Sequence, residues 1–259
     1  MKLAVSNIAW DAAHDNEMYS FIKSCGFTGL EIAPTRLFAQ PYDSLAQAKA
    51  FAAELKAEYV LSIPSMQSIW FGRSENIFAS KEERQALLEY TKKAILFAQV
   101  IDCWNLVFGC PKNRNLPEEA DISPALEFFA QAGDFAQAHN TVFALEANPP
   151  IYNTNFINTT AQAFAICREL NNLGLRVNVD LGTIIYNNED IDIVAENIDL
   201  VNHIHISEPY LEPIEKRALH KALLALNFDG FVSIEMKNTG SLEQIKAAVE
   251  YIAGESESV

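Results

Sequence analysis

Three acidic residues and one histidine end four apolar runs in the second half of the chain. They are Glu146 in VFALEAN, Asp180 in RVNVDLG, His205 in NHIHISE and Glu235 in VSIEMK. Successive members are 34, 25 and 30 residues apart, the spacing of a repeated unit of one strand and one helix. If the runs are neighbouring strands of one parallel sheet, the carboxylates meet at one point and repel one another unless a cation lies between them. The pattern therefore predicts a divalent-metal site in a metal-dependent enzyme.

The predicted ligands are mostly hard oxygen atoms. Such a set favours Mn²⁺ or Mg²⁺, with Co²⁺ or Zn²⁺ as further candidates. The alternative is that Glu146, Asp180 and Glu235 only cap helices or form ion pairs at strand ends. We expect His203, two residues before His205, to be a hydrogen-bonded core histidine rather than a ligand.

Short apolar or β-branched runs alternate with longer stretches of helical period along the whole chain. The expected strands are Leu3–Ile8, Gly29–Ile32, Tyr59–Ile63, Asn105–Phe108, Val142–Ala147, Val177–Leu181, Val201–Ile206 and Phe231–Met236. The expected helices lie near 15–25, 43–57, 80–102, 123–139, 159–172, 190–197, 212–226 and 241–253. Strict alternation of eight strands and eight helices predicts an α/β fold, a single-domain (β/α)8 TIM barrel over residues 1–253, with a short C-terminal tail at 254–259. Active sites of such barrels lie at the carboxyl ends of the strands, where the four predicted ligands fall.

Side-chain alternation and helix caps agree with these elements. In VNVDL, Asn178 and Asp180 fall on one side of the strand and the two valines on the other, as expected of a strand between a polar barrel interior and a layer of helices. Ser80 and Ser241 each open a capping-box pattern, and Thr159 stands where an N-cap is expected.

The composition excludes several classes of protein. Hydrophobic residues make up 49% of the 259 residues, enough for a large core, yet no apolar stretch reaches the roughly 20 residues that cross a membrane. A net charge of −15 opposes nonspecific binding to nucleic acid. The four cysteines show no CxxC spacing, which favours a reduced, cytoplasmic setting over a disulfide framework. The sequence leaves self-association into a homo-oligomer open.

The segments ALEAN, NVDLG, HIHISE and SIEMK, in that order, resemble the xylose isomerase-like TIM-barrel family. The resemblance extends from GFTGLEIAP to GFVSIEMK. The family includes sugar phosphate isomerases and epimerases, keto-sugar 3-epimerases, cyclitol dehydratases and the second family of AP endonucleases. The resemblance implies that Glu146, Asp180, His205 and Glu235 hold the metal. It also implies that Glu146 and Glu235 are the catalytic acid/base pair, acting through a metal-stabilised cis-enediolate of the substrate.

Two positions depart from the family pattern. Many members carry a histidine where this chain has Thr183, and the keto-sugar 3-epimerases carry an arginine where it has Leu211. These departures argue against a free-ketose 3-epimerase with the usual substrate contacts. They also leave two alternatives to an isomerase or epimerase: a sugar or cyclitol dehydratase, and a barrel that binds carbohydrate without catalysis.

The loops after the expected strands are predicted to bind a small sugar substrate. They carry the cations Arg36, Arg73, Lys112, Arg114 and Lys237, which favour an anionic sugar such as a phosphate or an acid. The alternative is that these cations only pair with neighbouring acids. Trp10 and Trp70 offer flat apolar faces to a sugar ring, and Gln67 and Asn148 offer hydrogen bonds to its hydroxyl groups.

Overall fold

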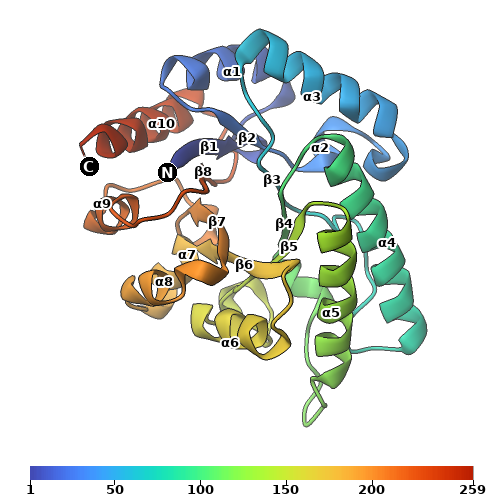
Figure 1. Ribbon diagram of the computed structural model, residues 1–259. Coiled ribbons are helices and arrows are strands. Elements are labelled where there is room, and N and C mark those ends of the chain that lie inside the picture. Colours follow the sequence, from blue (N-terminus) through green and yellow to red (C-terminus); the bar gives the residue numbers. More distant parts are fainter. Residues whose placement is uncertain (259) are drawn as a thin grey trace.

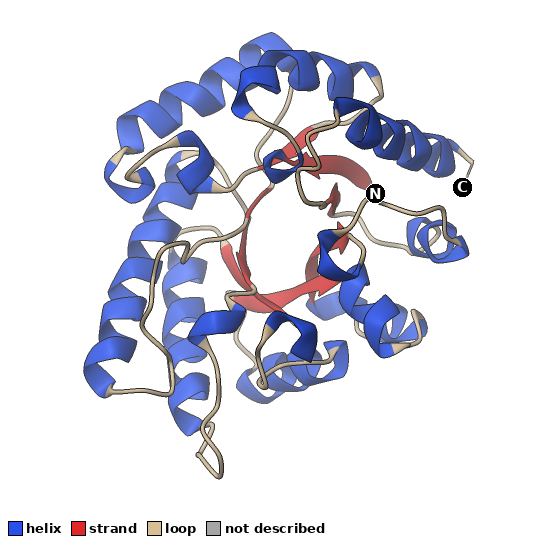
Figure 2. Ribbon diagram, turned by 180° about the vertical axis from the view of Figure 1, so that it is seen from behind, coloured by secondary structure: helices blue, strands red, loops and turns tan. Residues whose placement is uncertain are grey.

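In the computed structural model, which describes residues 1–258, helices surround a ring of parallel strands (Figures 1 and 2). The strands are β1 Lys2–Ser6, β2 Gly29–Glu31, β3 Ser65–Met66, β4 Asn105–Phe108, β5 Val142–Glu146, β6 Leu175–Asp180, β7 Val201–Ile206 and β8 Phe231–Ile234. The helices are α1 Asp15–Ser24, α2 Pro34–Leu37, α3 Leu45–Tyr59, α4 Lys81–Val100, α5 Ser123–Ala138, α6 Thr160–Leu170, α7 Leu181–Asn187, α8 Asp192–Glu196, α9 Ala218–Leu224 and α10 Leu242–Glu257. The predicted single-domain (β/α)8 barrel is confirmed.

The strand order is β2-β1-β8-β7-β6-β5-β4-β3, with every pair parallel. The ring closes between β2 and β3 through two isolated bridges, Gly29 to Ser62 and Ile32 to Met66. Pro64 lies between these bridges and has no N–H group to donate, so a continuous ladder cannot form there. The barrel is therefore nearly closed, with its weakest seam at β3.

Aliphatic side chains on the outer side of the strands pack against the helices. In β6 and β7, Val177, Val179, Ile204 and Ile206 are all buried in the hydrophobic core. The alternate positions in these strands carry polar side chains that are also buried, such as Asn178 in the barrel interior. This alternation lets apolar packing fix the strands while polar groups gather inside the ring.

Some predicted boundaries were wrong. Tyr59 ends α3, and the third strand lies at Ser65–Met66 rather than at Tyr59–Ile63. The helix expected at 212–226 is confined to Ala218–Leu224, because Pro213 holds Glu212 extended with φ −62° and ψ 163°. Two additional helices are present, α2 at Pro34–Leu37 and α7, which starts directly after Asp180.

Helix α10 extends into the segment that was expected to form a C-terminal tail. Helix α10 continues to Glu257, so at least 254–257 of the expected tail are helical, and Val259 lies outside the described residues. Thr159 forms the predicted cap with Gln162, and Ser80 accepts a hydrogen bond from the Glu83 N–H, whereas Ser241 makes no side-chain cap. No helix within residues 1–258 is long and apolar enough to cross a membrane.

Candidate metal centre and active site

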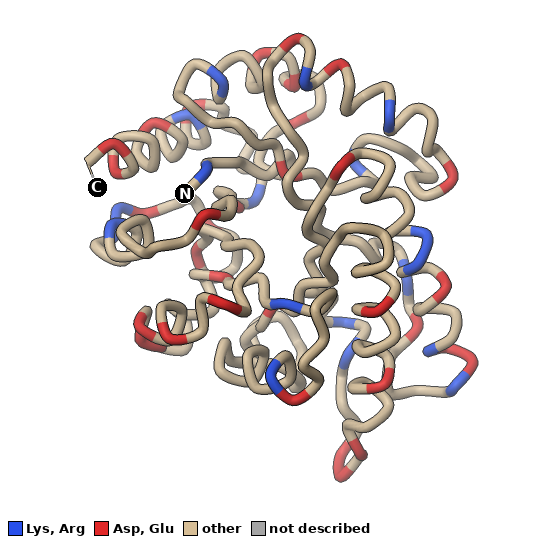
Figure 3. Tube along the Cα trace, in the orientation of Figure 1, with Lys and Arg blue, Asp and Glu red and all other residues tan. Residues whose placement is uncertain are grey.

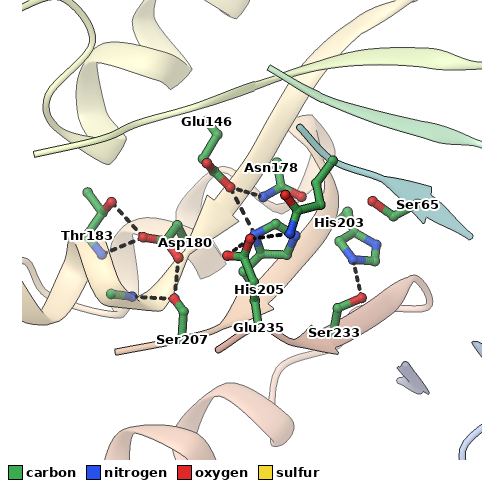
Figure 4. A network of polar contacts seen from close by, with 12 residues as sticks. Ser65, Glu146, Asn178, Asp180, Thr183, His203, His205, Ser207, Ser233 and Glu235 are labelled. Atoms are coloured by element: carbon green, nitrogen blue, oxygen red, sulfur yellow. Dashed lines mark hydrogen bonds and ion pairs between the residues drawn. The ribbon is translucent and has the colours of Figure 1, made fainter. Parts of the chain in front are cut away.

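The four predicted ligands meet at the carboxyl ends of β5 to β8 (Figure 4). Glu146 and Asp180 are the last residues of β5 and β6, His205 lies in β7, and Glu235 directly follows β8. One ligand atom from each residue lies within 4.8 Å of all the others. All four residues are buried, with exposures between 0% and 8%. The predicted convergence is thus present, in a geometry that could hold one cation.

His205 is oriented as a metal ligand would be. Its Nε2 atom lies 2.8 Å from Oε2 of Glu31, so an Nε2–H group can donate to that carboxylate. Its Nδ1 atom lies 2.9 Å from Glu146 Oε1 and 3.0 Å from Glu235 Oε2, within ion-pair distance of both. A divalent cation could take the place of the proton on Nδ1 and would be held by Nδ1 and the three acids.

Hydrogen-bond donors hold the three carboxylates in place. Asn178 Nδ2 donates to Glu146 over 2.7 Å, and Gln67 Nε2 donates to Glu235 over 2.8 Å. Asp180 accepts from Thr183 through N–H at 2.7 Å and Oγ1–H at 2.8 Å, and also from Ser207 Oγ–H. Thr183, which departs from the family pattern, therefore positions a predicted ligand while Asp180 caps α7.

The crowding of charge perturbs several pKa values. Burial, and then the charge of Glu146, raises the pKa of Asp180 to about 6. Burial also raises the pKa of Glu235 to about 7, although the neighbouring His205 acts in the opposite direction. Burial disfavours the charged form of His205, but the charges of Glu235 and Glu31 outweigh it and hold the pKa well above 6.5. Without a cation, the cluster thus tends to hold protons near neutral pH.

Glu31 is a site residue that the sequence analysis missed. It ends β2, is fully buried, and its Oε2 atom contacts Nε2 of both His205 and His203, at 2.8 and 3.4 Å. The signal was present in GFTGLEIAP, where an acid ends an apolar strand. His203 itself is hydrogen-bonded to Ser233 at 2.8 Å and buried, in agreement with the predicted core histidine.

A cavity of about 200 Å³ opens directly over the acid cluster. Its lining comprises Gln67, Ser68, Val107, Gly109, Cys110, Pro111, Glu146, Asn148, Tyr152, Asp180, Leu211 and Glu235. Gln67 and Asn148 were both predicted to bind substrate, and both line the cavity. Each also donates a hydrogen bond to one of the acids, Gln67 to Glu235 and Asn148 to Glu146.

Three other predicted substrate contacts need correction, because these side chains are buried elsewhere. Trp10 donates its indole N–H to Asp15, and Trp70 donates to Thr91 and packs edge-on against Phe108 and Phe128. Arg114 is fully buried and donates to backbone oxygens of Glu146 and Ile157 and to the side chain of Asn148. None of the three lines the cavity.

The remaining predicted cations do not converge on the cavity either. Lys112 is exposed outside the lining, and Lys237 is exposed and paired with Glu212. Along the chain, Lys and Arg are scattered around the barrel rather than gathered at one place (Figure 3). The grouping of cations that favoured an anionic substrate is therefore not found among residues 1–258.

Comparison with known proteins places the chain in a family. The profile of the xylose isomerase-like TIM barrel matches residues 19–254, and the chain belongs to this family. A search of curated protein sequences found no significant match.

Solved structures share the whole fold at low sequence identity. The E. coli 3-keto-D-glucoside 4-epimerase is 20% identical, with a TM-score of 0.77 and 99% of each chain covered. The D-psicose 3-epimerase of Clostridium cellulolyticum H10 is 14% identical, with a TM-score of 0.80 and 100% and 99% covered. A probable 3-DHS dehydratase from Bacillus anthracis is 15% identical, with a TM-score of 0.67 and 99% and 98% covered. These likenesses establish the fold.

The contact between Glu31 and His205 generates a first prediction. The Glu31 carboxylate favours a proton on His205 Nε2 and so leaves Nδ1 as the atom that faces the cluster. The substitution Glu31→Gln removes this charge. Loss of such a supporting partner lowers metal affinity by about 10–100-fold. Titration calorimetry with Mn²⁺ measures the change, and Glu54→Gln, which removes an exposed acid on α3, serves as the control. Equal Mn²⁺ affinity in both variants would argue against this role for Glu31.

The raised pKa values generate a second prediction. With pKa values of about 7 for Glu235 and about 6 for Asp180, protons occupy the cluster as the pH falls from 8 to 6. Metal must displace these protons, so Mn²⁺ affinity should fall by about 10-fold or more over this interval. Calorimetry in buffers of different ionisation enthalpy should show proton release on binding. Affinity that is constant between pH 8 and 6 contradicts the expected competition.

Proposed function

We propose that this protein is a divalent-metal-dependent isomerase or epimerase of a sugar or sugar derivative. The observation that carries the proposal is the placement of Glu146 and Glu235 around the Nδ1 atom of His205. In the strand order β5-β6-β7-β8 these two acids come from the two outer strands, and both line the cavity. Two carboxylates on either side of a substrate can remove a proton from one side and return one from the other.

A bound cation, for which we propose Mn²⁺ or Mg²⁺, supplies stabilisation of the negative charge that develops on the substrate's carbonyl oxygen. The chain's own acids move the proton. One of Glu146 and Glu235 takes the proton from the carbon beside the carbonyl. The other delivers a proton to the opposite face of that carbon, giving an epimer, or to the neighbouring carbon, giving an aldose–ketose isomer.

The hydrogen bonds around the acids support this division of roles. Asp180 accepts three hydrogen bonds from Thr183 and Ser207, which favour its charged form and suit it to holding a cation. Glu235 accepts one from Gln67 and lines the cavity, so its carboxylate can reach a bound substrate. Glu146 and Glu235 are accordingly the proposed acid/base pair, and Asp180 and His205 the purely metal-holding residues.

We also propose that the protein acts in the cytoplasm. All four cysteines are free, the net charge is −15, and Lys and Arg positions are scattered along the trace of residues 1–258 (Figure 3). These features support action in the cytoplasm on a small molecule.

Substitution of the two acids tests the proposal. Glu146→Gln and Glu235→Gln should each lower the rate of deuterium incorporation from D₂O into a turned-over sugar by about 10²–10⁴-fold, the usual contribution of a general acid or base. The measurement is mass spectrometry of the sugar after incubation with Mn²⁺-loaded protein. Glu243→Gln on the exposed face of α10 should retain full activity.

Two results would contradict the proposal. One is full activity of either active-site variant with unchanged thermal unfolding. The other is a product that has lost the mass of water, which assigns the same acids to a dehydratase.

A further inference from the structure

Two amides hold the Glu146 carboxylate, one at each oxygen atom. Asn178 Nδ2, from the neighbouring strand β6, donates to Oε1 over 2.7 Å. Asn148 Nδ2, from the segment that follows β5, donates to Oε2 over 3.1 Å. If the Asn148 amide turned over, its Oδ1 atom would face the carboxylate and the hydrogen bond would be lost. The position of Glu146 therefore depends on which way the Asn148 amide points.

Arg114 determines the orientation of the Asn148 amide. Its Nη2 atom donates to Asn148 Oδ1 over 2.9 Å, and its Nη1 atom donates to the Glu146 carbonyl over 2.9 Å. A guanidinium carries donors and no acceptor, so the amide atom that faces it must be the oxygen. The Nδ2 atom of Asn148 is then left to face Glu146. The charge of the donor makes this hydrogen bond stronger than one from a neutral group.

Arg114 is also buried without a carboxylate as its hydrogen-bond acceptor. Its side chain is fully buried, and its acceptors are neutral oxygens of Glu146, Asn148 and Ile157. Burial lowers the pKa of Arg114 to about 10, so the guanidinium stays charged at neutral pH. Arginine is rarely buried in this way, and an apolar side chain would fill the same space at lower cost. The hydrogen bonds of Arg114 are thus the property that distinguishes it from a packing residue.

Gly109 leaves the space that the Glu146 carboxylate occupies. A Cβ atom at this position would lie 2.7 Å from Glu146 Oε2 and 3.3 Å from Asn148 Oδ1. The first distance is shorter than a normal contact between carbon and oxygen. Because Oε2 is the end of a flexible side chain, the carboxylate would move while the backbone stayed in place. Any other residue at position 109 would therefore displace the acid.

The other proposed acid/base residue is held in a similar way. Ser68 Oγ donates to Gln67 Oε1 over 2.6 Å, and Gln67 Nε2 donates to Glu235 over 2.8 Å. Each acid thus accepts a hydrogen bond from an amide whose oxygen is held by a third residue. The hydroxyl group of Ser68 can also accept a hydrogen bond, whereas the guanidinium of Arg114 cannot. The amide beside Glu146 is therefore the more firmly oriented of the two.

We propose that Arg114 and Gly109 are positioning residues for Glu146. Arg114 orients the Asn148 amide that holds the carboxylate, and Gly109 leaves the space beside it. The inference rests on the proposed function, in which Glu146 holds the metal and moves a proton. It gives Arg114 a role in place of the substrate contact that was expected from the sequence.

Gly109→Ala tests the space beside Glu146. The displaced carboxylate should lower Mn²⁺ affinity by about 10-fold or more. It should also lower the rate of deuterium incorporation into a turned-over sugar by about 10²-fold, because a small misplacement of a catalytic group has an effect of that size. Titration calorimetry and mass spectrometry measure the two changes. Gly254→Ala in α10, where an added Cβ atom meets nothing within 4 Å, should change neither.

A second substitution separates displacement of Glu146 from general damage. Glu146→Asp withdraws the carboxylate from residue 109, so adding Gly109→Ala to this variant should lower Mn²⁺ affinity by no more than about 2-fold. Full additivity of the two losses overturns the role of Gly109. A Gly109→Ala variant with wild-type Mn²⁺ affinity does the same.

Arg114 is tested through Asn148. Arg114→Gln should lower Mn²⁺ affinity by about 10-fold, because a neutral amide at position 114 can face Asn148 in either orientation. Arg114→Lys keeps a charged donor and should retain more of the affinity. In an Asn148→Ala background, Arg114→Gln should lower the affinity by no more than about 2-fold further.

Two results overturn the role of Arg114. One is a loss on Arg114→Gln that is equally large with and without Asn148, and the other is wild-type affinity of the folded Gln variant. Thermal unfolding shows which variants are folded. If Arg114→Gln is not, the comparison of the two backgrounds is made with Arg114→Lys and decided in the same way.

The binding measurements separate this inference from the proposed function. If the Mn²⁺-loaded protein exchanges deuterium with no sugar, the isomerase or epimerase function fails, and the couplings measured by calorimetry still decide the roles of Arg114 and Gly109. If sugars exchange deuterium and the couplings are absent, the function stands and this inference falls. A wild-type protein that binds no Mn²⁺ overturns both.

Discussion

Three carboxylates and one imidazole share a small buried volume in this protein, and their mutual electrostatics constrain everything around them. Glu146, Asp180 and Glu235 are almost removed from water, where like charges repel most strongly. The protein offsets this repulsion in part with His205 and with side-chain donors from Gln67 and Asn178. The proposed divalent cation would complete the arrangement, because it would convert the repulsion into shared coordination.

The barrel makes such an arrangement sustainable. Each candidate ligand lies at or next to the end of a strand whose aliphatic side chains are buried in the hydrophobic core, so apolar burial fixes the strand while the polar group is presented inside the ring. Behind the ligands, Glu31 from β2 reaches His205 from the far side. The side chains of the cluster are thus oriented by hydrogen-bonding partners from several different strands and loops of the barrel.

The sequence predicted much of this site because strand ends recur with a regular spacing. Glu146, Asp180, His205 and Glu235 could be found from alternation and period alone. Glu31 also ends an apolar strand, but its role behind His205 could not be assigned from that pattern, because the contact spans 174 residues and depends on how the barrel closes.

The predictions for long side chains failed for a related reason. Trp10, Trp70 and Arg114 follow strands as substrate-binding residues do, yet each turns into the core. There they donate hydrogen bonds to Asp15, Thr91 and the Glu146 carbonyl, respectively. Position along the chain predicts which edge of the sheet a residue occupies. It does not predict which way a flexible side chain turns, since that depends on packing partners distant in sequence. The third strand was misplaced for a local reason, because α3 extends through Tyr59 and Pro64 interrupts the pairing that follows.

A crystal structure of the protein soaked with Mn²⁺, with the ion located by its anomalous scattering, tests the central claim most directly. The account predicts one Mn²⁺ ion within about 2.3 Å of His205 Nδ1 and of carboxylate oxygens from Glu146, Asp180 and Glu235. An ion bound elsewhere, with these four side chains left uncoordinated at saturating Mn²⁺, would contradict it.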